Sequence, residues 1–396
     1  MIAGVPLESY PGERRVALVP GVIPMLAKVG VEVVVQQGAG AAAGFPDADY
    51  EARGAHLVAD RGQIFSTADV VLLVHGPDGS SAAPAGELDA LRPAQVLIGL
   101  LNPLGAPQVA RELATRKATA FALELLPRIS RAQSMDVLSS MASLAGYKAV
   151  LLAAAALDKI YPLMMTAAGT ITPSRTLVIG AGVAGLQAIA TSRRLGSVVT
   201  AYDVRPAVKE QVVSLGAKFL EMPLETASAE GAGGYARAMG EEFYRRQREL
   251  MGGAVAESDA VITTAAVPGE KAPVLVTEDM VRGMRSGAVI VDLAAETGGN
   301  CALTRAGETA QVHGVTIIGP VNLAASLPYH ASQMYARNMT AFLQNLVKDG
   351  RAQLDSDDEI IRASLLTHGG EVVNPRVRKL LGLSDEAAPA ASARSA

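Results

Sequence analysis

The sequence predicts an α/β fold with two doubly wound parallel-sheet domains joined by long helices, with a cleft between the domains. Runs rich in valine and isoleucine alternate with helical patterns along most of the chain, as is typical of parallel sheets covered on both faces. These runs form two series, separated by a long alanine- and leucine-rich pattern. The 396-residue length suits two or three domains, and 49% hydrophobic residues can fill large cores.

The strand candidates are short apolar runs, most of them rich in β-branched residues. In the first series they are 16-VALVP-20, 31-VEVVVQ-36, 69-DVVLLV-74 and 95-QVLIGLL-101. In the second series they are 175-RTLVIG-180, 197-SVVTAYD-203, 259-DAVITTAA-266, 287-GAVIVDLA-294 and 315-VTIIG-319. Helical stretches separate most of them, so each series predicts one doubly wound domain.

Two long helices are predicted where the chain passes between the domains. The first covers 143–161, and the second covers 331–350 and ends at a glycine. The second helix is expected to return the chain to the first domain. The expected divisions are a discontinuous N-terminal domain of residues 1–140 with 330–384, a second domain of residues 141–329, and a disordered low-complexity tail over 385–396.

Charge and cysteine content argue against several classes of function. The formal net charge is −4 and no long block of like charge occurs, so nucleic acid is not an expected partner. The single cysteine, Cys301, excludes an internal disulfide framework, and the scattered histidines lack metal-ligand spacing. No secretory signal and no direct membrane insertion are predicted, and a long charge-free run, 93–110, contains three prolines.

The strongest local motif is a glycine fingerprint in 177-LVIGAGVAGLQAIATSRRLGSVVTAYDVR-205. Gly180, Gly182 and Gly185 follow a predicted strand and open a predicted helix. They permit a tight turn, close approach of backbone to a pyrophosphate, and close helix–strand packing. Asp203 ends the next strand, where a carboxylate accepts hydrogen bonds from ribose hydroxyls and repels a 2′-phosphate. The motif predicts a Rossmann-like domain that prefers NAD(H) to NADP(H); Arg205 nearby could weaken this preference, but Asp203 should dominate.

A glycine-rich segment, 224-LETASAEGAGGYARAMG-240, interrupts the second series. It has few large apolar side chains and cannot bury much surface, so a loop is expected. Two interpretations stay open. The segment is either a disordered insertion or a lid that closes over a ligand through Tyr235.

A polar stretch, 127-PRISRAQSMDVLSS-140, lies between apolar patterns. It holds two arginines, a glutamine, an aspartate and four serines in a chain that is otherwise hydrophobic. Such a run indicates either a surface loop or a binding site.

These features, taken with several shorter segments, resemble the NAD(H)-binding component (the alpha-1 subunit, or domain I) of proton-translocating NAD(P) transhydrogenase. The segments that carry the resemblance are 13-ERRVALVP-20, 127-PRISRAQSMDVLSS-140, 166-TAAGTITP-173, 177-LVIGAGVAGLQAIAT-191, 208-VKEQVVSLGAKF-219, 291-VDLAAETGGN-300 and 367-THGGEVV-373. The chain is more distantly similar to alanine dehydrogenase. The resemblance covers nearly the whole length, and the polar stretch is its most specific segment.

The resemblance implies that the polar stretch lies in the interdomain cleft and touches the nicotinamide end of NAD(H). Arg128 and Ser139 would then hold the nicotinamide amide, Asp136 would accept from its NH2 group, and Gln133 would contact the ribose and face the second nucleotide. An amide offers two donors and one acceptor, so a carboxylate, a cation and a hydroxyl can fix its orientation. The expected nucleotide contacts are Gly180, Gly182, Val183, Ala184, Gly185, Asp203, Val204, Arg205, Tyr235, Ala265 and Glu296.

The resemblance also implies partners. The chain carries one dinucleotide fingerprint, so NADP(H) is expected on a separate NADP(H)-binding subunit, with membrane subunits completing a proton-translocating complex. A homodimer is implied, in the cytoplasm and peripheral to the inner membrane. One segment departs from the pattern, because Ala324, Ala325 and Ser326 stand where Pro-Ser-Arg is expected. The departure leaves the domain interface or partner contact at this place in question.

Two other functions compete: a self-sufficient amino- or keto-acid dehydrogenase and a non-catalytic NAD(H) sensor. By resemblance, alanine dehydrogenase uses an anion-binding arginine and lysine, a general-base histidine and an aspartate. Arg15 could match the arginine, whereas His75, Asn102 and Glu296 fall at the other three places. An amide cannot take a proton at neutral pH, so Asn102 cannot act as general base. This difference favours the transhydrogenase interpretation.

Overall fold

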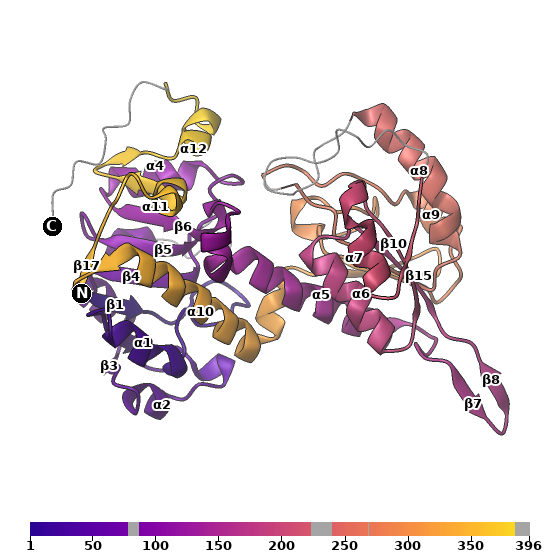
Figure 1. Ribbon diagram of the computed structural model, residues 1–396, viewed down its shortest axis with the longest axis horizontal. Helices are drawn as coiled ribbons and strands as arrows, with labels where there is room; N and C mark the ends of the chain where they lie inside the picture. The colour runs from indigo at the N-terminus through magenta and orange to yellow at the C-terminus, as the bar shows by residue number, and fades with distance from the viewer. Residues whose placement is uncertain (78–86, 223–239, 268, 385–396) are drawn as a thin grey trace. The chain divides into compact units, whose positions relative to one another are not determined.

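The computed structural model describes residues 1–77, 87–222, 240–267 and 269–384. The chain divides into two compact units, Met1–Met141 with Ala325–Ala396, and Ala142–Ala324. Each unit is built on one largely parallel sheet with helices packed on it, so the predicted α/β class with two parallel sheets is confirmed (Figure 1). The glycine-rich segment with Tyr235, expected to be a disordered insertion or a lid, and the expected disordered tail lie outside the described residues.

The first unit contains an eight-stranded sheet in the order β19-β18-β6-β5-β4-β1-β2-β3. Its strands are β1 (Ile2–Val5), β2 (Glu32–Gln36), β3 (His56–Val58), β4 (Val70–His75), β5 (Val96–Leu100), β6 (Thr119–Ala122), β18 (Leu365–His368) and β19 (Glu371–Val372). The first six pair in parallel in doubly wound order, and β18 and β19 extend the sheet through antiparallel pairs. Three of the predicted strands are thereby confirmed as β2, β4 and β5.

Helices cover both faces of this sheet. The helices and 3-10 turns are η1 (Pro20–Val22), α1 (Ile23–Ala27), η2 (Ala41–Ala43), α2 (Asp47–Glu51), α3 (Arg61–Thr67), η3 (Glu87–Ala90), α4 (Gln108–Thr115), η4 (Leu123–Leu125), η5 (Ser130–Met135), α10 (Pro328–Leu346), α11 (Glu359–Ser364) and α12 (Pro375–Leu380). The 3-10 turn η9 (Leu323–Ser326) spans the boundary between the two units. Ile64 of α3 and Leu113 of α4 share a core with Ala120 of β6. The next residue, Phe121, points to the opposite face and meets Phe342 of α10 edge-on at 5.4 Å between ring centroids.

Residues 16–20 are buried, but they do not form the predicted strand. Side chains from distant elements bond to two backbone groups of this segment instead. The Val16 N–H donates to Ser332 Oγ at 3.0 Å, and the Leu18 carbonyl accepts from the Tyr50 hydroxyl at 2.9 Å. A buried segment whose polar backbone groups are satisfied in this way needs no strand partner. The apolar pattern therefore indicated a buried segment here, and the strand predicted from it was wrong.

Helix α10 ends before the glycine that the sequence suggested as its stop. The last helical residue is Leu346, and a short antiparallel hairpin follows. The hairpin strands are β16 (Val347–Lys348) and β17 (Arg351–Ala352). Asp349 and Gly350 join them with φ angles of 51° and 70°, as two-residue hairpin turns require. Gly350 therefore belongs to the hairpin turn.

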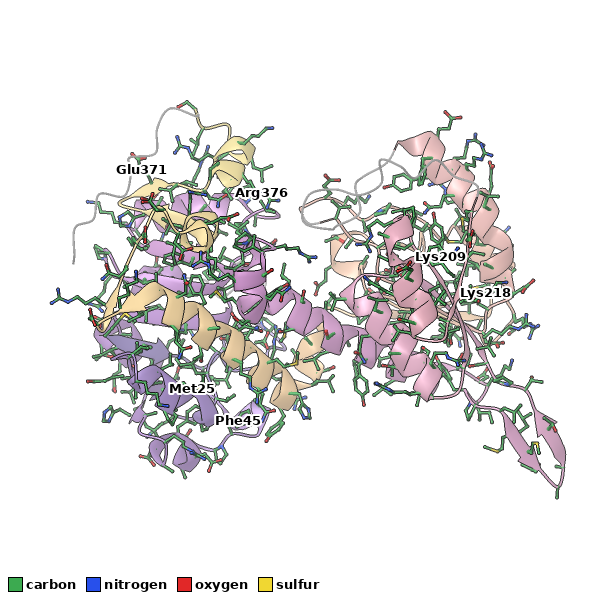
Figure 2. All side chains as sticks on the ribbon, in the orientation of Figure 1. Met25, Phe45, Lys209, Lys218, Glu371 and Arg376 are labelled. Atoms are coloured by element: carbon green, nitrogen blue, oxygen red, sulfur yellow. The ribbon has the colours of Figure 1, made fainter. Side chains whose placement is uncertain are left out.

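The second unit contains a seven-stranded sheet in the order β11-β10-β9-β12-β13-β15-β14. Its strands are β9 (Arg175–Ile179), β10 (Val198–Tyr202), β11 (Lys218–Phe219), β12 (Ala260–Thr263), β13 (Val289–Asp292), β14 (Thr309–Val312) and β15 (Val315–Ile318). All pairs are parallel except β14 with β15. The five strands predicted in the second series are confirmed as β9, β10, β12, β13 and β15. The outermost strands β11 and β19 carry exposed Lys218 and Glu371 (Figure 2), and charges there oppose edge-to-edge association.

Alternate residues of these strands fill two cores. The helices and turns on the sheet are α6 (Val183–Arg194), η6 (Pro206–Val208), α7 (Lys209–Ser214), α8 (Glu241–Ala256), α9 (Glu278–Arg282) and η8 (Ala295–Thr297). Val178 packs with Ile189 of α6 on one face. Its neighbours Leu177 and Ile179 pack with Met251 of α8 on the other. This two-residue period is that of a strand buried on both sides.

Helix α5 (Val137–Ala156) begins and ends earlier than the predicted helix over 143–161. By length and composition alone it is the one helix among the described residues that could cross a membrane, a feature that the charge-free runs of the sequence did not predict. Part of its surface packs against protein. Ala149 and Ala153 are buried in the core of the second unit, and a Cβ on Gly146 would lie 2.1 Å from the Ala184 carbonyl oxygen.

A hairpin of two short strands projects from the second unit (Figure 1). It pairs β7 (Met164–Thr166) with β8 (Gly169–Ile171), and every strand residue is exposed. Met165 is 76% exposed. An isolated two-stranded hairpin is marginally stable in water.

Candidate functional site

The glycine fingerprint forms a tight turn between β9 and α6. Gly180 has a φ of +96°, and a Cβ there would lie 2.5 Å from Thr264 Oγ1. The Thr264 hydroxyl donates to the Gly180 carbonyl at 3.0 Å. A Cβ on Gly185 would lie 1.8 Å from the same carbonyl oxygen. Gly180 and Gly185 are therefore required by the turn and by helix–strand packing.

Gly182 differs from its neighbours because nothing lies within 4 Å of the position where its Cβ would be. It is the N-cap of α6, and no side chain caps the helix there. Val183 and Ala184 form the first turn, in which backbone N–H groups lack helical partners. An open space in front of a helix N-terminus favours an anion such as a diphosphate.

Asp203 follows β10, and its carboxylate accepts four hydrogen bonds. The Ala181 N–H donates to Oδ2 at 2.7 Å, and the Arg205 N–H donates to Oδ1 at 2.8 Å. The Arg205 side chain adds a fork, with Nε on Oδ1 at 2.9 Å and Nη2 on Oδ2 at 2.8 Å. The carboxylate thus links the glycine turn to the end of β10, with Val204 between the two charged residues.

The structure adds two residues to this region that sequence reasoning missed. Asn300 holds Ala265 at both backbone atoms, donating to its carbonyl at 2.8 Å and accepting from its N–H at 3.0 Å. The fully buried Asp292 accepts from the Thr263 hydroxyl, the Thr304 hydroxyl, and the N–H groups of Ala294 and Cys301. Both residues lie in 291-VDLAAETGGN-300, so the signal was present. Their partners became apparent only in the folded chain.

Two other expected nucleotide contacts lie differently. Glu296 is exposed in η8, and its carboxylate accepts from the Asn322 N–H at 2.5 Å. Tyr235 lies outside the described residues.

The polar stretch in the first unit combines a helix cap with exposed side chains. Asp136 precedes α5, and its carboxylate accepts from the Ser139 N–H at 2.9 Å and from the Ser139 hydroxyl at 2.6 Å. These bonds satisfy the helix N-terminus. Arg128 and Gln133 are exposed. The structure therefore pairs two of the four expected nicotinamide contacts with each other, and leaves the other two on the surface of this unit.

Side chains from the C-terminal segment fix the same stretch. Arg131 forms an ion pair with Asp358 before α11, with Nη1 2.9 Å from Oδ2. The Arg131 guanidinium lowers the pKa of the Asp358 carboxyl to about 2. Asn338 of α10 donates to the Ser134 carbonyl at 2.8 Å. The backbone of η5 is thus tied to α10 and α11, which restricts the positions available to Gln133.

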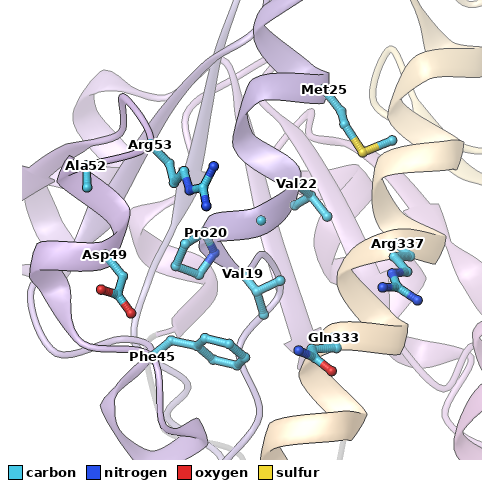
Figure 3. Close-up of a pocket in the computed structure, with 11 residues that line it drawn as sticks. Val19, Pro20, Val22, Met25, Phe45, Asp49, Ala52, Arg53, Gln333 and Arg337 are labelled. Carbon is cyan, nitrogen blue, oxygen red and sulfur yellow. The ribbon is translucent and has the colours of Figure 1, made fainter.

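A pocket of about 530 Å³ lies elsewhere on the first unit, between η1, α2 and α10 (Figure 3). Val22 and Phe45 form part of its apolar lining, and Arg53 and Arg337 supply charge. None of the expected site residues lines it. Within the described part of the chain, no group of three His, Cys, Asp or Glu side chains is placed to hold a metal ion.

Comparison with known proteins gives the family. The profile of the alanine dehydrogenase/PNT N-terminal domain matches residues 4–145, and that of the C-terminal domain matches residues 149–375. The chain belongs to the alanine dehydrogenase/PNT family. In Rhodospirillum rubrum, the polypeptide named as the first part of NAD(P) transhydrogenase subunit alpha is 46% identical over 378 residues, which are 95% of this chain and 98% of that protein.

Two further family members show which branch is nearer. The crystal structure of transhydrogenase from Sinorhizobium meliloti superposes with a TM-score of 0.82 at 43% identity, covering 95% of this chain and 99% of that chain. Alanine dehydrogenase of Bacillus subtilis is 30% identical over 395 residues, covering 96% of this chain and 95% of that protein. The resemblance to transhydrogenase, with a more distant likeness to alanine dehydrogenase, is confirmed.

The first unit of this family member also holds a buried cluster of ionisable groups. Glu13 binds Arg15 through two bonds, Nε to Oε1 at 2.7 Å and Nη2 to Oε2 at 2.6 Å. Burial raises the pKa of the nearby Glu8 carboxyl to about 8, although the N–H groups of Val74 and His75 donate to it. The Arg15 guanidinium is thus already engaged by an internal carboxylate.

Asn102 lies at the carboxyl end of β5. Its backbone φ is +47°, and its N–H donates to Glu124 at 2.6 Å. Burial raises the pKa of the Glu124 carboxyl to about 7.

Proposed function

We propose that the chain is the NAD(H)-binding component of a proton-translocating NAD(P) transhydrogenase and that it acts with partner subunits. The observation that carries this proposal is the open space at Gly182, beside the N-terminus of α6 and Asp203. The near full-length similarity to a protein named as one portion of a transhydrogenase subunit supports it. That name indicates that the relative shares its activity with other polypeptides.

The second unit holds the nucleotide in this proposal. The turn from Gly180 to Gly185, with Val183 and Ala184 in the first turn of α6, takes the diphosphate. Asp203, Val204 and Arg205 face the adenosine ribose, while Ala265 and Glu296 bound the site further along the chain. When bound, NADH supplies a hydride from its nicotinamide C4 to NADP⁺ held on the partner subunit.

The polar stretch of the first unit orients the nicotinamide in this proposal. Arg128 and Gln133 offer exposed polar groups, and Asp136 and Ser139 complete the contacts to the amide. A carboxylate has about four acceptor sites, so Asp136 can cap α5 and still accept from a ligand. Catalysis is then chiefly positioning, because two flat rings must meet at about 3–3.5 Å.

The partners proposed are an NADP(H)-binding subunit and membrane subunits, with the chain in the cytoplasm and peripheral to the inner membrane. A homodimer is also proposed. The exposed hairpin at 164–171 supports it, because a second copy would cover a strand pair that is marginally stable alone. Sedimentation of the wild type and of Met165→Glu tests this proposal. The wild type should be a dimer and Met165→Glu, with a charge on the covered hairpin, should be a monomer. A monomeric wild type would contradict the proposal.

An assay of the chain with defined partners distinguishes the candidate functions. The chain should exchange hydride between NADH and an NADP⁺ analogue only when an NADP(H)-binding domain from a related transhydrogenase is added. Turnover of alanine or pyruvate by the chain alone would instead establish a dehydrogenase; Asn102 at the place of the base and the engagement of Arg15 by Glu13 argue against it. Tight NADH binding without exchange would leave a sensor.

Gln133→Asn tests the proposed nicotinamide contact. Shortening this side chain should slow hydride transfer at least tenfold while NADH affinity changes little, since only positioning is lost. Ser134→Ala is the matched control, because this exposed neighbour contributes its carbonyl to the fold and should leave the rate unaltered. An unchanged rate in Gln133→Asn would remove Gln133 from the site.

A further inference from the structure

The Asp203 carboxylate is fully engaged before any nucleotide is bound. Two of its donors are backbone N–H groups, from Ala181 and Arg205, and two are guanidinium nitrogens of Arg205. Both side chains are largely buried, with 13% exposure for Arg205 and 5% for Asp203. A carboxylate offers about four acceptor positions. No position remains for a ribose hydroxyl while the Arg205 fork stays in place.

The two kinds of donor differ in charge. The backbone N–H groups belong to the glycine turn and to the segment after β10, and they carry no formal charge. The Arg205 guanidinium places a positive charge beside the carboxylate. A guanidinium also matches a phosphate group in bidentate geometry.

We propose that Arg205 is a specificity-determining residue of the nucleotide site: its side chain neutralises Asp203 and so weakens the discrimination against nucleotides that carry a 2′-phosphate. The inference rests on the proposed nucleotide site. An unneutralised Asp203 would repel a 2′-phosphate at close range, and the paired guanidinium offsets that repulsion. Asp203 therefore strengthens the preference for NAD(H) over NADP(H), and Arg205 weakens it.

The test is the ratio of the dissociation constants for NADPH and NADH, measured on the full chain by calorimetry and by competition. Arg205→Ala and Arg205→Gln remove the charge and should raise the ratio about tenfold. Arg205→Lys keeps the charge without the fork, and its ratio should stay within about threefold of the wild type. Asp203→Ala should lower the ratio. Thermal melting of each variant verifies folding, and the Gln and Lys variants provide the comparison if the Ala variant is unstable.

The outcomes separate this inference from the proposed function. If Arg205→Ala and Arg205→Gln weaken both nucleotides equally, the ratio is unchanged and Arg205 only supports the carboxylate, which overturns the inference. If the wild-type chain binds neither nucleotide, the proposed nucleotide site itself is wrong. A raised ratio in both neutral variants, with the Lys variant near the wild type, supports the inference.

Discussion

A Cβ on Gly185 would lie 1.8 Å from the carbonyl oxygen of Gly180, so the first turn of α6 is packed directly on the end of β9. Gly182, between them, has open space instead. The same small change should therefore have different effects at two positions of one motif. Gly185→Ala should lower the thermal midpoint by several degrees and abolish NADH binding, because the turn must shift.

Gly182→Ala is the matched variant. Its φ of −75° suits alanine and its methyl group meets no protein atom. The thermal midpoint should stay within about 1 °C of the wild type, while NADH affinity falls at least tenfold because the methyl group fills the phosphate space. Calorimetry and thermal melting of both variants distinguish packing from binding. Normal NADH affinity in a folded Gly182→Ala variant would argue against the diphosphate position.

Asn300→Asp tests the residue that holds Ala265. The amide donates to the carbonyls of Ala265 and Pro273 at 2.8 and 2.9 Å, and a carboxylate would place oxygen against both. We expect a loss of about 2–4 kcal/mol in the free energy of unfolding. Gln108→Glu, the same change at an exposed helix start, should cost almost nothing. Equal unfolding curves for the two variants would count against the role of Asn300.

Gly146→Ala tests the packing of α5 on α6. Alanine is favoured over glycine within helices by about 1 kcal/mol, but a Cβ here would lie 2.1 Å from the Ala184 carbonyl. Overpacking should exceed the propensity gain and give a net loss of about 1–3 kcal/mol. Gly252→Ala in α8 is the control, since nothing lies within 4 Å of its added Cβ and it should be stabilising. Denaturant unfolding of both variants measures the difference in sign.

Stability should fall as pH rises from about 4.5, the ordinary pKa of a glutamate carboxyl, to about 8, and should change little above pH 8. Burial raises the pKa of Glu8 to about 8 in the folded chain, so between its unfolded value and pH 8 the folded state binds the extra proton. The stabilisation from protonated Glu8 is complete below the pKa of this carboxyl in the unfolded chain. It decreases as pH rises above that value and is lost once pH has passed the pKa in the folded chain. Each pH unit in that window costs up to about 1.4 kcal/mol. Glu124, with a pKa of about 7, contributes in the same direction.

Glu8→Gln, which stays neutral, should flatten this dependence, as followed by the thermal midpoint between pH 5 and 9. The exposed Glu51→Gln serves as control and should retain the slope of the wild type. If the thermal midpoint of Glu8→Gln depends on pH as that of the wild type does, a group other than Glu8 causes the dependence.

The strands that the sequence predicted correctly are those with long, β-branched runs. β2, β4, β5 and the central strands of the second sheet are buried on both faces, so their composition alone marks them. The four-residue strands β6 and β18 escaped prediction, because their sequences TAFA and LLTH contain only one β-branched residue each. The buried run at 16–20 was misassigned, since hydrogen bonds from Ser332 and Tyr50, distant in sequence, replace a strand partner.

The sequence by itself determined the α/β class, the glycine turn with its acidic residue, and the resemblance to transhydrogenase, because local spacing encodes each of them. Only the tertiary structure showed that the polar stretch includes the cap of α5 and is tied to Asp358 and Asn338. The tertiary structure also showed the hydrogen bonds between Asn300 and Ala265, which are 35 residues apart, and the two hydrogen bonds from the Arg205 guanidinium to the Asp203 carboxylate. Such contacts depend on side-chain directions and on strands brought together by folding, which residue spacing does not specify.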